Sequence, residues 1–118
     1  MARLSTHVLD LAAGKPATGM RLELFKLGAP GERVSLKATT TNADGRTDEP
    51  LLSGDAIETG VYELVFQAAA YLRSQGHNLP EFPFLDEIIL RFGIADPQGH
   101  YHVPLLLSPF GYSTYRGS

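Results

Sequence analysis

The sequence contains no cysteine, which excludes disulfide bonds and thiolate metal sites and fits a reducing compartment. It has no excess of positive charge, since the formal net charge is −3, and this argues against a nucleic-acid binder with a basic surface stripe. No apolar run approaches the roughly 18 residues of a membrane-spanning helix, and no charged-then-apolar leader opens the chain. We therefore expect a soluble, cytoplasmic protein that binds neither nucleic acid nor membrane.

The length of 118 residues leaves room for one domain around one core, and we expect a single domain over residues 1–118. A chain of this size buries roughly two-thirds of its unfolded surface, which is enough to fold without cross-links. The sequence has no internal repeat and no low-complexity segment, so nothing in it suggests a second folded unit or a long linker.

Short stretches of alternating apolar and polar residues, separated by turn residues, predict a succession of β-strands. The expected strands cover residues 5–10, 20–27, 34–41, 60–66, 88–94, 101–107 and 110–115. Between the fourth and the fifth, three alanines followed by Tyr71, Leu72 and Arg73 favour a short helix that Gly76 ends. Seven or eight short strands with one small helix predict an all-β fold, an antiparallel β-sandwich.

Two of the four histidines, His7 and His102, fall inside expected strands, where each side chain must point to a definite face. Ser5 shares its strand face with His7. His100 and His102 also share a face, and with His7 they could form a three-histidine zinc site. His100, however, directly follows Gly99 and is expected in a turn, which argues against that metal site.

Arg46 directly follows a turn sequence at residues 42–45, and Arg116 lies close to the C-terminus. Most arginines are solvated surface charges. Two guanidinium groups together with two histidines nevertheless suit a planar, oxygen-rich, anionic small molecule, because the guanidinium fork binds such groups through two hydrogen bonds. No Gly-rich phosphate loop, Ser-His-Asp signature or pair of catalytic carboxylates stands out.

Three parts of the chain resemble motifs of the transthyretin-like family. Residues 4–10 with 14–17 are similar to its opening motif, residues 41–46 to its central arginine segment, and residues 101–104 with 107–118 to its closing motif. The ending Tyr115-Arg116-Gly117-Ser118 resembles that of the 5-hydroxyisourate hydrolases within the family, whereas the hormone-carrying transthyretins end differently.

This resemblance implies a transthyretin-like β-sandwich and an enzyme of urate (purine) degradation. The implied reaction is hydrolysis of 5-hydroxyisourate to 2-oxo-4-hydroxy-4-carboxy-5-ureidoimidazoline, without metal or organic cofactor. The implied assembly is a homotetramer with its sites in a channel between two dimers. His7, Arg46 and His102 fall on the family's catalytic positions. The residues that fall on its substrate-binding positions are Tyr115, Arg116, Gly117 and Ser118.

In this interpretation the two histidines act as acid and base, and Arg46 stabilises the oxyanion formed when water adds to a ring carbonyl. The sequence leaves open which histidine is the base. If the last strand continues through the tail, Tyr115 and Arg116 point to opposite faces. Gly117 would permit a sharp turn, after which Ser118 offers a hydroxyl and a carboxylate to the site.

The main alternative is a transthyretin-like carrier of a small aromatic ligand. Such a carrier needs an apolar channel, which His7, Arg46 and His102 would make polar. A sandwich with a purely structural role would explain none of these three residues. The sequence therefore favours the hydrolase over both other interpretations.

Overall fold

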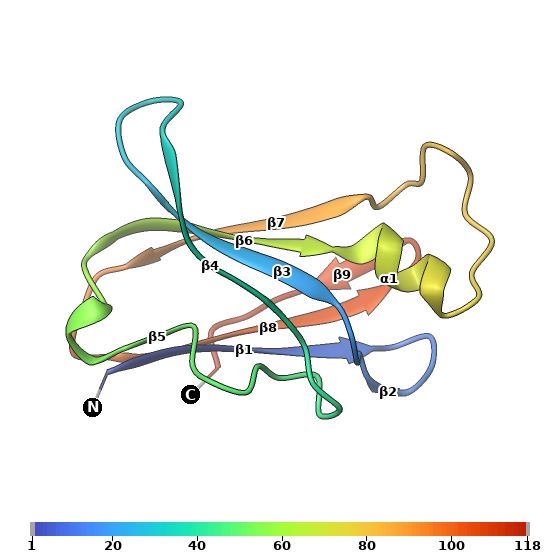
Figure 1. The fold of residues 1–118 in the computed structure, drawn as a ribbon, viewed down its shortest axis with the longest axis horizontal. Coiled ribbons are helices and arrows are strands. Elements are labelled where there is room, and N and C mark those ends of the chain that lie inside the picture. The colour runs from blue at the N-terminus through green and yellow to red at the C-terminus, as the bar shows by residue number, and fades with distance from the viewer. Residues whose placement is uncertain (1, 118) are drawn as a thin grey trace.

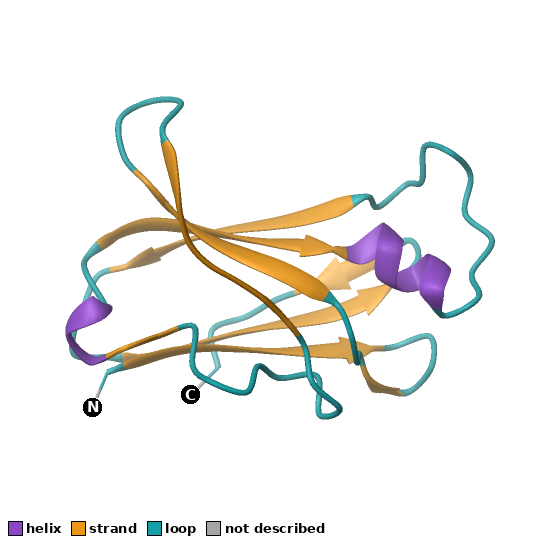
Figure 2. Ribbon diagram, in the orientation of Figure 1, coloured by secondary structure: helices purple, strands orange, loops and turns teal. Residues whose placement is uncertain are grey.

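Two β-sheets stacked face to face form the body of the molecule, and a short helix covers one end of the stack (Figure 1 and Figure 2). The computed structural model describes residues 2–117. The strands in this range are β1 (Arg3–Asp10), β2 (Lys15–Pro16), β3 (Arg21–Leu27), β4 (Arg33–Thr40), β5 (Leu52–Ser53), β6 (Gly60–Gln67), β7 (Glu87–Ile94), β8 (His100–Ser108) and β9 (Gly111–Ser113). The helical segments are a 3-10 turn (Gly54–Ala56) and α1 (Ala68–Ser74). Neither helix of the described range has the length and apolar character that crossing a bilayer would require.

The strand order explains how distant parts of the chain meet. The first sheet has the order β2-β1-β8-β9, with β5 also paired to β1, and the second has the order β4-β3-β6-β7. Across residues 2–117 every strand pairing is antiparallel except that of β1 with β8, which run parallel. The predicted β-sandwich with one short α-helix is confirmed. The described range has nine strands rather than seven or eight, because β2 and β5 are too short for alternation to reveal.

Alternation along the strands decides which side chains enter the core. In β1 the side chains of Leu4, Thr6 and Val8 are buried, whereas Ser5 and His7 lie half-buried on the other face. Large buried side chains come from both sheets: Leu24, Tyr62, Leu64, Phe66, Ile88, Leu105 and Leu107. One face of each sheet therefore fills the core, and the opposite face of β1 and β8 remains available for a site.

A buried carboxylate ties the helix to the first strand. Asp10 is 1% exposed, and the Tyr71 hydroxyl of α1 donates a hydrogen bond to its Oδ2 at 2.7 Å. The backbone amide of Ala13 donates to Asp10 Oδ1 at 3.0 Å. Burial and then the Asp10 carboxylate raise the pKa of Tyr71, so the phenol remains a proton donor at neutral pH. This contact fixes α1 over the end of the sandwich.

We expect Tyr71→Phe to lower the melting temperature. The substitution leaves Asp10 Oδ2 buried without its donor, which costs about 1–3 kcal/mol. Thermal unfolding followed by circular dichroism measures the effect. Tyr112→Phe is the matched control, because Tyr112 is 45% exposed and its hydroxyl has no hydrogen bond within the described residues. Equal melting temperatures for the two variants would show that the Tyr71–Asp10 contact does not stabilise the fold.

Candidate functional site

The outer face of the β1–β8 pair brings together polar side chains from the two ends of the sequence. In the parallel register Ser5 lies opposite His102, and His7 lies opposite Pro104. Because alternate residues of a strand share a face, Ser5, His7 and His102 all point away from the core. All three are half-buried. The two histidines predicted to be catalytic therefore lie on one face, two positions apart in the register.

His102 is held by groups on two sides of its ring. Ser5 Oγ lies 2.9 Å from His102 Nδ1, and the backbone amide of Gly117 donates to the His102 carbonyl at 2.8 Å. A Cβ atom added to Gly117 would lie 2.7 Å from His102 Cδ2, which is closer than real Cβ atoms approach. The tail therefore packs directly against the imidazole, and only glycine fits at position 117.

The electrostatic surroundings of His102 are positive. Burial, and then the positive charges of Arg46, His7 and Arg3, hold the pKa of His102 below its usual value of 6.5. At neutral pH the ring is therefore uncharged, and a neutral imidazole can accept a proton. Two contacts bring the three segments together: the turn before Arg46 touches His7, and β1 pairs with β8 at Ser5 and His102.

His7 has a different partner. Its Nε2 lies 2.9 Å from the backbone carbonyl oxygen of Asp44. A carbonyl oxygen can only accept a hydrogen bond, so His7 Nε2 carries the proton and donates it. This donation is possible in both protonation states of the ring, and the protonated ring would offer a second N–H at Nδ1. The same contact joins β1 to the turn that precedes Arg46.

The turn at residues 42–46 positions Arg46. Asn42 Oδ1 accepts hydrogen bonds from the amides of Asp44 at 2.9 Å and Arg46 at 3.2 Å. Gly45 has φ +75°, and its carbonyl accepts from the Val8 amide at 2.8 Å. A Cβ atom at Gly45 would lie 2.4 Å from the Val8 carbonyl oxygen. The turn therefore docks on β1 beside His7, and glycine is required both for the positive φ and for the close contact.

A small cavity of about 220 Å³ lies between this turn and the first strand. Its lining residues are Arg3, Ser5, Thr6, Arg46, Thr47, Asp48, Glu49 and Pro50. The Arg46 side chain is exposed and, within residues 2–117, has no hydrogen bond or ion pair. Ligand pockets usually measure about 300–1,000 Å³, so this cavity would hold only part of a drug-sized molecule.

The C-terminal tail runs along β8, but it is not a strand throughout. β9 ends at Ser113, and an isolated bridge joins Gly117 to His102. Between them Thr114 Oγ1 donates to the Pro104 carbonyl at 2.7 Å. Pro104, which has no amide hydrogen, lies opposite His7 in the β1–β8 pairing, and its carbonyl points to the irregular tail on the other side.

The expected alternation of Tyr115 and Arg116 is wrong, because the strand stops before them. Both side chains line the same cavity of about 570 Å³, which does not include His7, Arg46 or His102. The Arg116 guanidinium lies 4.2 Å from the centre of the Tyr101 ring and donates to the His100 carbonyl at 3.2 Å.

Gly117 does not have a positive φ, and its close packing on His102 gives a reason for glycine at this position. The turn expected after it leads into Ser118, beyond the described range. Ser118, the last residue assigned to the substrate site, lies outside the described residues.

The other two histidines lie apart from the pair. His100 is exposed at the start of β8, and His77 follows α1. Among residues 2–117, no group of three or more His, Cys, Asp or Glu side chains has an arrangement that could hold a metal ion. The three-histidine zinc alternative therefore has no geometric support in the described range.

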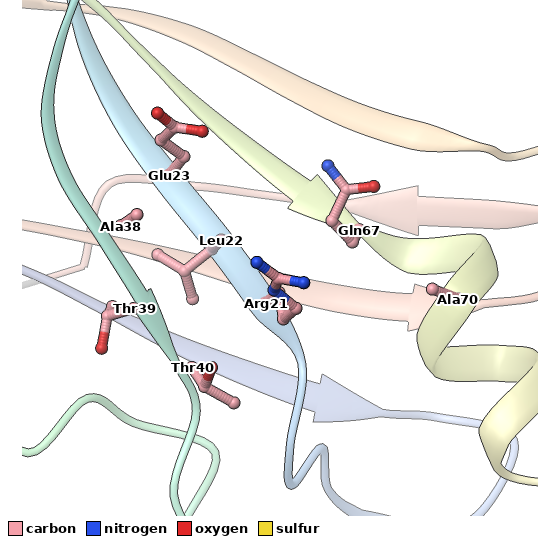
Figure 3. Close-up of a pocket in the computed structure, with 8 residues that line it drawn as sticks. All are labelled: Arg21, Leu22, Glu23, Ala38, Thr39, Thr40, Gln67 and Ala70. Atoms are coloured by element: carbon pink, nitrogen blue, oxygen red, sulfur yellow. The ribbon is translucent and has the colours of Figure 1, made fainter.

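A third hollow, of about 420 Å³, lies on the outer face of the other sheet (Figure 3). Its lining residues are Arg21, Leu22, Glu23, Ala38, Thr39, Thr40, Gln67 and Ala70. Glu23 already accepts a hydrogen bond from Ser35 Oγ at 2.6 Å. The lining contains no histidine, and its charged side chains are Arg21 and Glu23. It is therefore a weaker candidate for chemistry than the β1–β8 face.

Reasoning from sequence missed two residues beside the site, Arg3 and Ser5. Ser5 was placed on the face of His7, but its contact with His102 spans 97 positions in the chain. Only the register between β1 and β8 reveals such a contact. Nothing in the sequence pointed to a functional role for Arg3, which lies two residues before Ser5 on the same strand face.

Comparisons with known proteins agree with this geometry. The sequence matches the HIUase/Transthyretin family over residues 4–117. The 5-hydroxyisourate hydrolase of Pseudomonas aeruginosa is 56% identical over 119 residues, which cover 100% of this chain and 93% of that protein. A likeness of this extent includes every segment that forms the site in the described range.

Solved structures with the same fold include a hydrolase, a transthyretin and an (S)-allantoin synthase. The structure of Klebsiella pneumoniae 5-hydroxyisourate hydrolase is 34% identical with a TM-score of 0.80, covering 100% of both chains. Sea bream transthyretin in complex with thyroxine is 32% identical with a TM-score of 0.85, covering 98% of this chain and 94% of that one. An (S)-allantoin synthase is 45% identical with a TM-score of 0.92 over 99% of this chain, which spans 44% of that one. The fold, the matched residues and the level of identity together place this chain in the HIUase/transthyretin family.

Proposed function

We propose that this chain hydrolyses 5-hydroxyisourate and that His7, Arg46 and His102 carry out the reaction. The observation that supports these roles is the different setting of two histidines on one face of the β1–β8 pair, close to the turn that carries Arg46. His102 Nδ1 contacts Ser5 Oγ, whereas His7 Nε2 donates to the Asp44 carbonyl. Two titratable groups in different surroundings can divide the acid and base roles between them. Hydrolysis to the carboxy-ureidoimidazoline product adds water to a ring carbonyl and breaks the adjacent ring C–N bond.

His102 is the proposed general base. Its positive surroundings and its burial keep the ring neutral, and a neutral imidazole with a free nitrogen can take a proton from water as that water attacks the carbonyl. Ser5 Oγ contacts Nδ1 of the His102 ring, and the Gly117 backbone packs against its Cδ2. The nitrogen left for catalysis is therefore Nε2.

His7 is the proposed general acid, and Arg46 the proposed oxyanion partner. A protonated His7 keeps its Nε2–H bond to the Asp44 carbonyl and can donate a proton from Nδ1 to the departing ring nitrogen. As water adds, the carbonyl oxygen gains negative charge, and the exposed Arg46 guanidinium can stabilise it. We propose that no metal or organic cofactor takes part, because these three side chains supply base, acid and positive charge.

The direct test uses freshly formed substrate. Urate and urate oxidase generate 5-hydroxyisourate, and its ultraviolet absorbance is followed after adding this protein. The expected result is decay much faster than the spontaneous reaction. Decay at the spontaneous rate would overturn the proposal. The carrier alternative predicts that same spontaneous rate, together with binding of an aromatic ligand, which calorimetry would detect.

The pH dependence offers a second test through Arg3. Because the positive charge of Arg3 contributes to lowering the pKa of His102, Arg3→Gln should raise that pKa. A base works only when unprotonated, so the acid limb of the kcat/KM profile should move to higher pH. Arg21→Gln, on the outer face of the other sheet, is the control and should leave the limb in place. A shift to lower pH, or none, would contradict His102 as the base.

We also propose that the working form is a homotetramer. Support comes from the free edges of the sheets, because β7 ends one sheet and β9 ends the other, and unpaired edges favour association. The apolar side chains Ile89 and Tyr115 near these edges are 46% and 59% exposed. The small size of the Arg46 cavity also favours a site completed by a second copy.

Light scattering combined with the decay assay tests the assembly, and an active monomer would refute it. For location, a cysteine-free chain suits a reducing compartment, and we propose the cytoplasm.

A further inference from the structure

We propose that Ser5 is a positioning residue for His102, accepting a hydrogen bond from Nδ1–H so that Nε2 presents its lone pair to substrate. This inference rests on the proposed function for the direction of the hydrogen bond and for its catalytic consequence. The geometric part, one fixed ring orientation and one tautomer, concerns the protein without substrate. It starts from the 2.9 Å contact between Ser5 Oγ and His102 Nδ1.

The ring orientation is fixed on both sides of Cγ. Ser5 lies at Nδ1, and the Gly117 backbone lies so close to Cδ2 that a methyl group would not fit between them. Backbone pairing places both partners beside His102: Ser5 lies opposite it in the β1–β8 ladder, and Gly117 bridges to it from the tail. A ring flip would place a carbon at the serine hydroxyl, losing that hydrogen bond. Nε2 and Cε1 are therefore the atoms left to face outward.

The direction of the hydrogen bond follows from the role proposed for Nε2. A hydroxyl can donate to a bare Nδ1 or accept from Nδ1–H, and the two cases leave opposite tautomers. A general base at Nε2 needs its lone pair there. The proton is therefore placed on Nδ1, and Ser5 Oγ accepts the bond from it.

Ser5 can accept this bond without leaving its own proton buried. The residue is half-buried and lines the cavity beside Arg46, so its O–H can point to water there. Within residues 2–117 the hydroxyl has no other hydrogen-bond partner. Arg3, Asp48 and Glu49 also line that cavity, and none of them has a hydrogen bond to His102.

Nuclear magnetic resonance tests the tautomer without any assay of activity. In protein labelled with ¹⁵N-histidine, two-bond ¹H–¹⁵N spectra show which ring nitrogen carries the proton. Substitution of each of the four histidines in turn assigns the signals. The expected result is a protonated Nδ1 and a bare Nε2 for His102. A protonated Nε2 in the neutral ring would overturn the proposed direction of the bond.

Kinetics test the consequence. Ser5→Ala should lower kcat about 10–100-fold, the range known for groups that orient metal-ligating histidines through their second ring nitrogen, with KM little changed. Ser5→Thr keeps a hydroxyl in a strand and should restore much of kcat. Ser35→Ala is the matched control, because this serine lies on the other sheet and donates to Glu23. It should leave kcat unchanged.

The outcomes separate the two proposals. If the wild-type protein shows no hydrolysis but His102 has the expected tautomer, the function fails and the positioning role of Ser5 stands. If hydrolysis is normal and Ser5→Ala changes neither kcat nor the His102 tautomer, the function stands and the role of Ser5 fails. If Ser5→Ala does not fold, the kinetics of Ser5→Thr and the wild-type NMR spectrum test the inference. A neutral His102 ring with its proton on Nε2 in the wild-type protein would overturn it.

Discussion

Replacing His102 with Gln is expected to reduce kcat by about 10²–10⁴-fold, the contribution usual for a positioned general base. The amide of Gln cannot take up a proton at neutral pH, while it occupies a similar volume. The change in melting temperature should be small, since the loss is one part-buried hydrogen bond worth about 0.5–1.5 kcal/mol. Decay of 5-hydroxyisourate absorbance and thermal unfolding measure the two quantities on the same protein sample.

The control for this variant is His100→Gln. His100 lies on the same strand and the same face, two residues before His102, but it is exposed. Its imidazole has no hydrogen bond within the described residues, so its loss should leave most of the activity. If both variants lost activity equally, and zinc restored activity after chelation, the three-histidine metal site would be the better explanation.

Arg46→Ala is expected to reduce kcat by about 10²–10³-fold, the effect of removing one group that stabilises an oxyanion. The melting temperature should hardly change. The Arg46 side chain is exposed, and substitutions at such positions usually alter stability by less than about 0.5 kcal/mol. The backbone of the turn is held by Asn42 and Gly45, neither of which needs the guanidinium. Absorbance decay under saturating substrate gives kcat directly.

Two further variants sharpen this prediction. Arg46→Lys keeps the positive charge without the planar fork, so it should recover only part of the lost rate. Arg21→Ala removes an exposed arginine from the outer face of the other sheet and should have no effect on turnover. A near-normal rate for Arg46→Ala would exclude Arg46 from the reaction and leave the oxyanion without an assigned partner in this chain.

The strands of this fold were predictable because each has a clear local pattern. Alternating side chains predicted β1, β3, β4, β6, β7 and β8 to within a few residues, and the alanine-rich stretch predicted α1. The residues His7, Arg46 and His102 were found from their places in strands and turns and from motifs that resemble those of a family. Such signals lie within a few residues of one another, so no contact across the fold was needed to read them.

What the sequence could not give depends on register between distant segments. The parallel pairing that puts Ser5 opposite His102 leaves no local mark, because either strand would alternate in the same way beside another partner. The 2.9 Å bond from His7 to the Asp44 carbonyl involves a backbone group, which every residue has. The end of the last strand was mispredicted for a related reason. Tyr115 and Arg116 resemble strand residues, but β9 ends at Ser113.

The pairing of β1 with β8 also sets the order of events during synthesis on the ribosome. β1 can meet β2 and β5 early, but its other edge stays open until β8 has been made. With 97 positions between Ser5 and His102 and synthesis at about 5–20 residues per second, that wait lasts about 5–20 s. Until then that edge of β1 keeps its N–H and C=O groups unpaired, and the two histidines can come together only after β8 has been made.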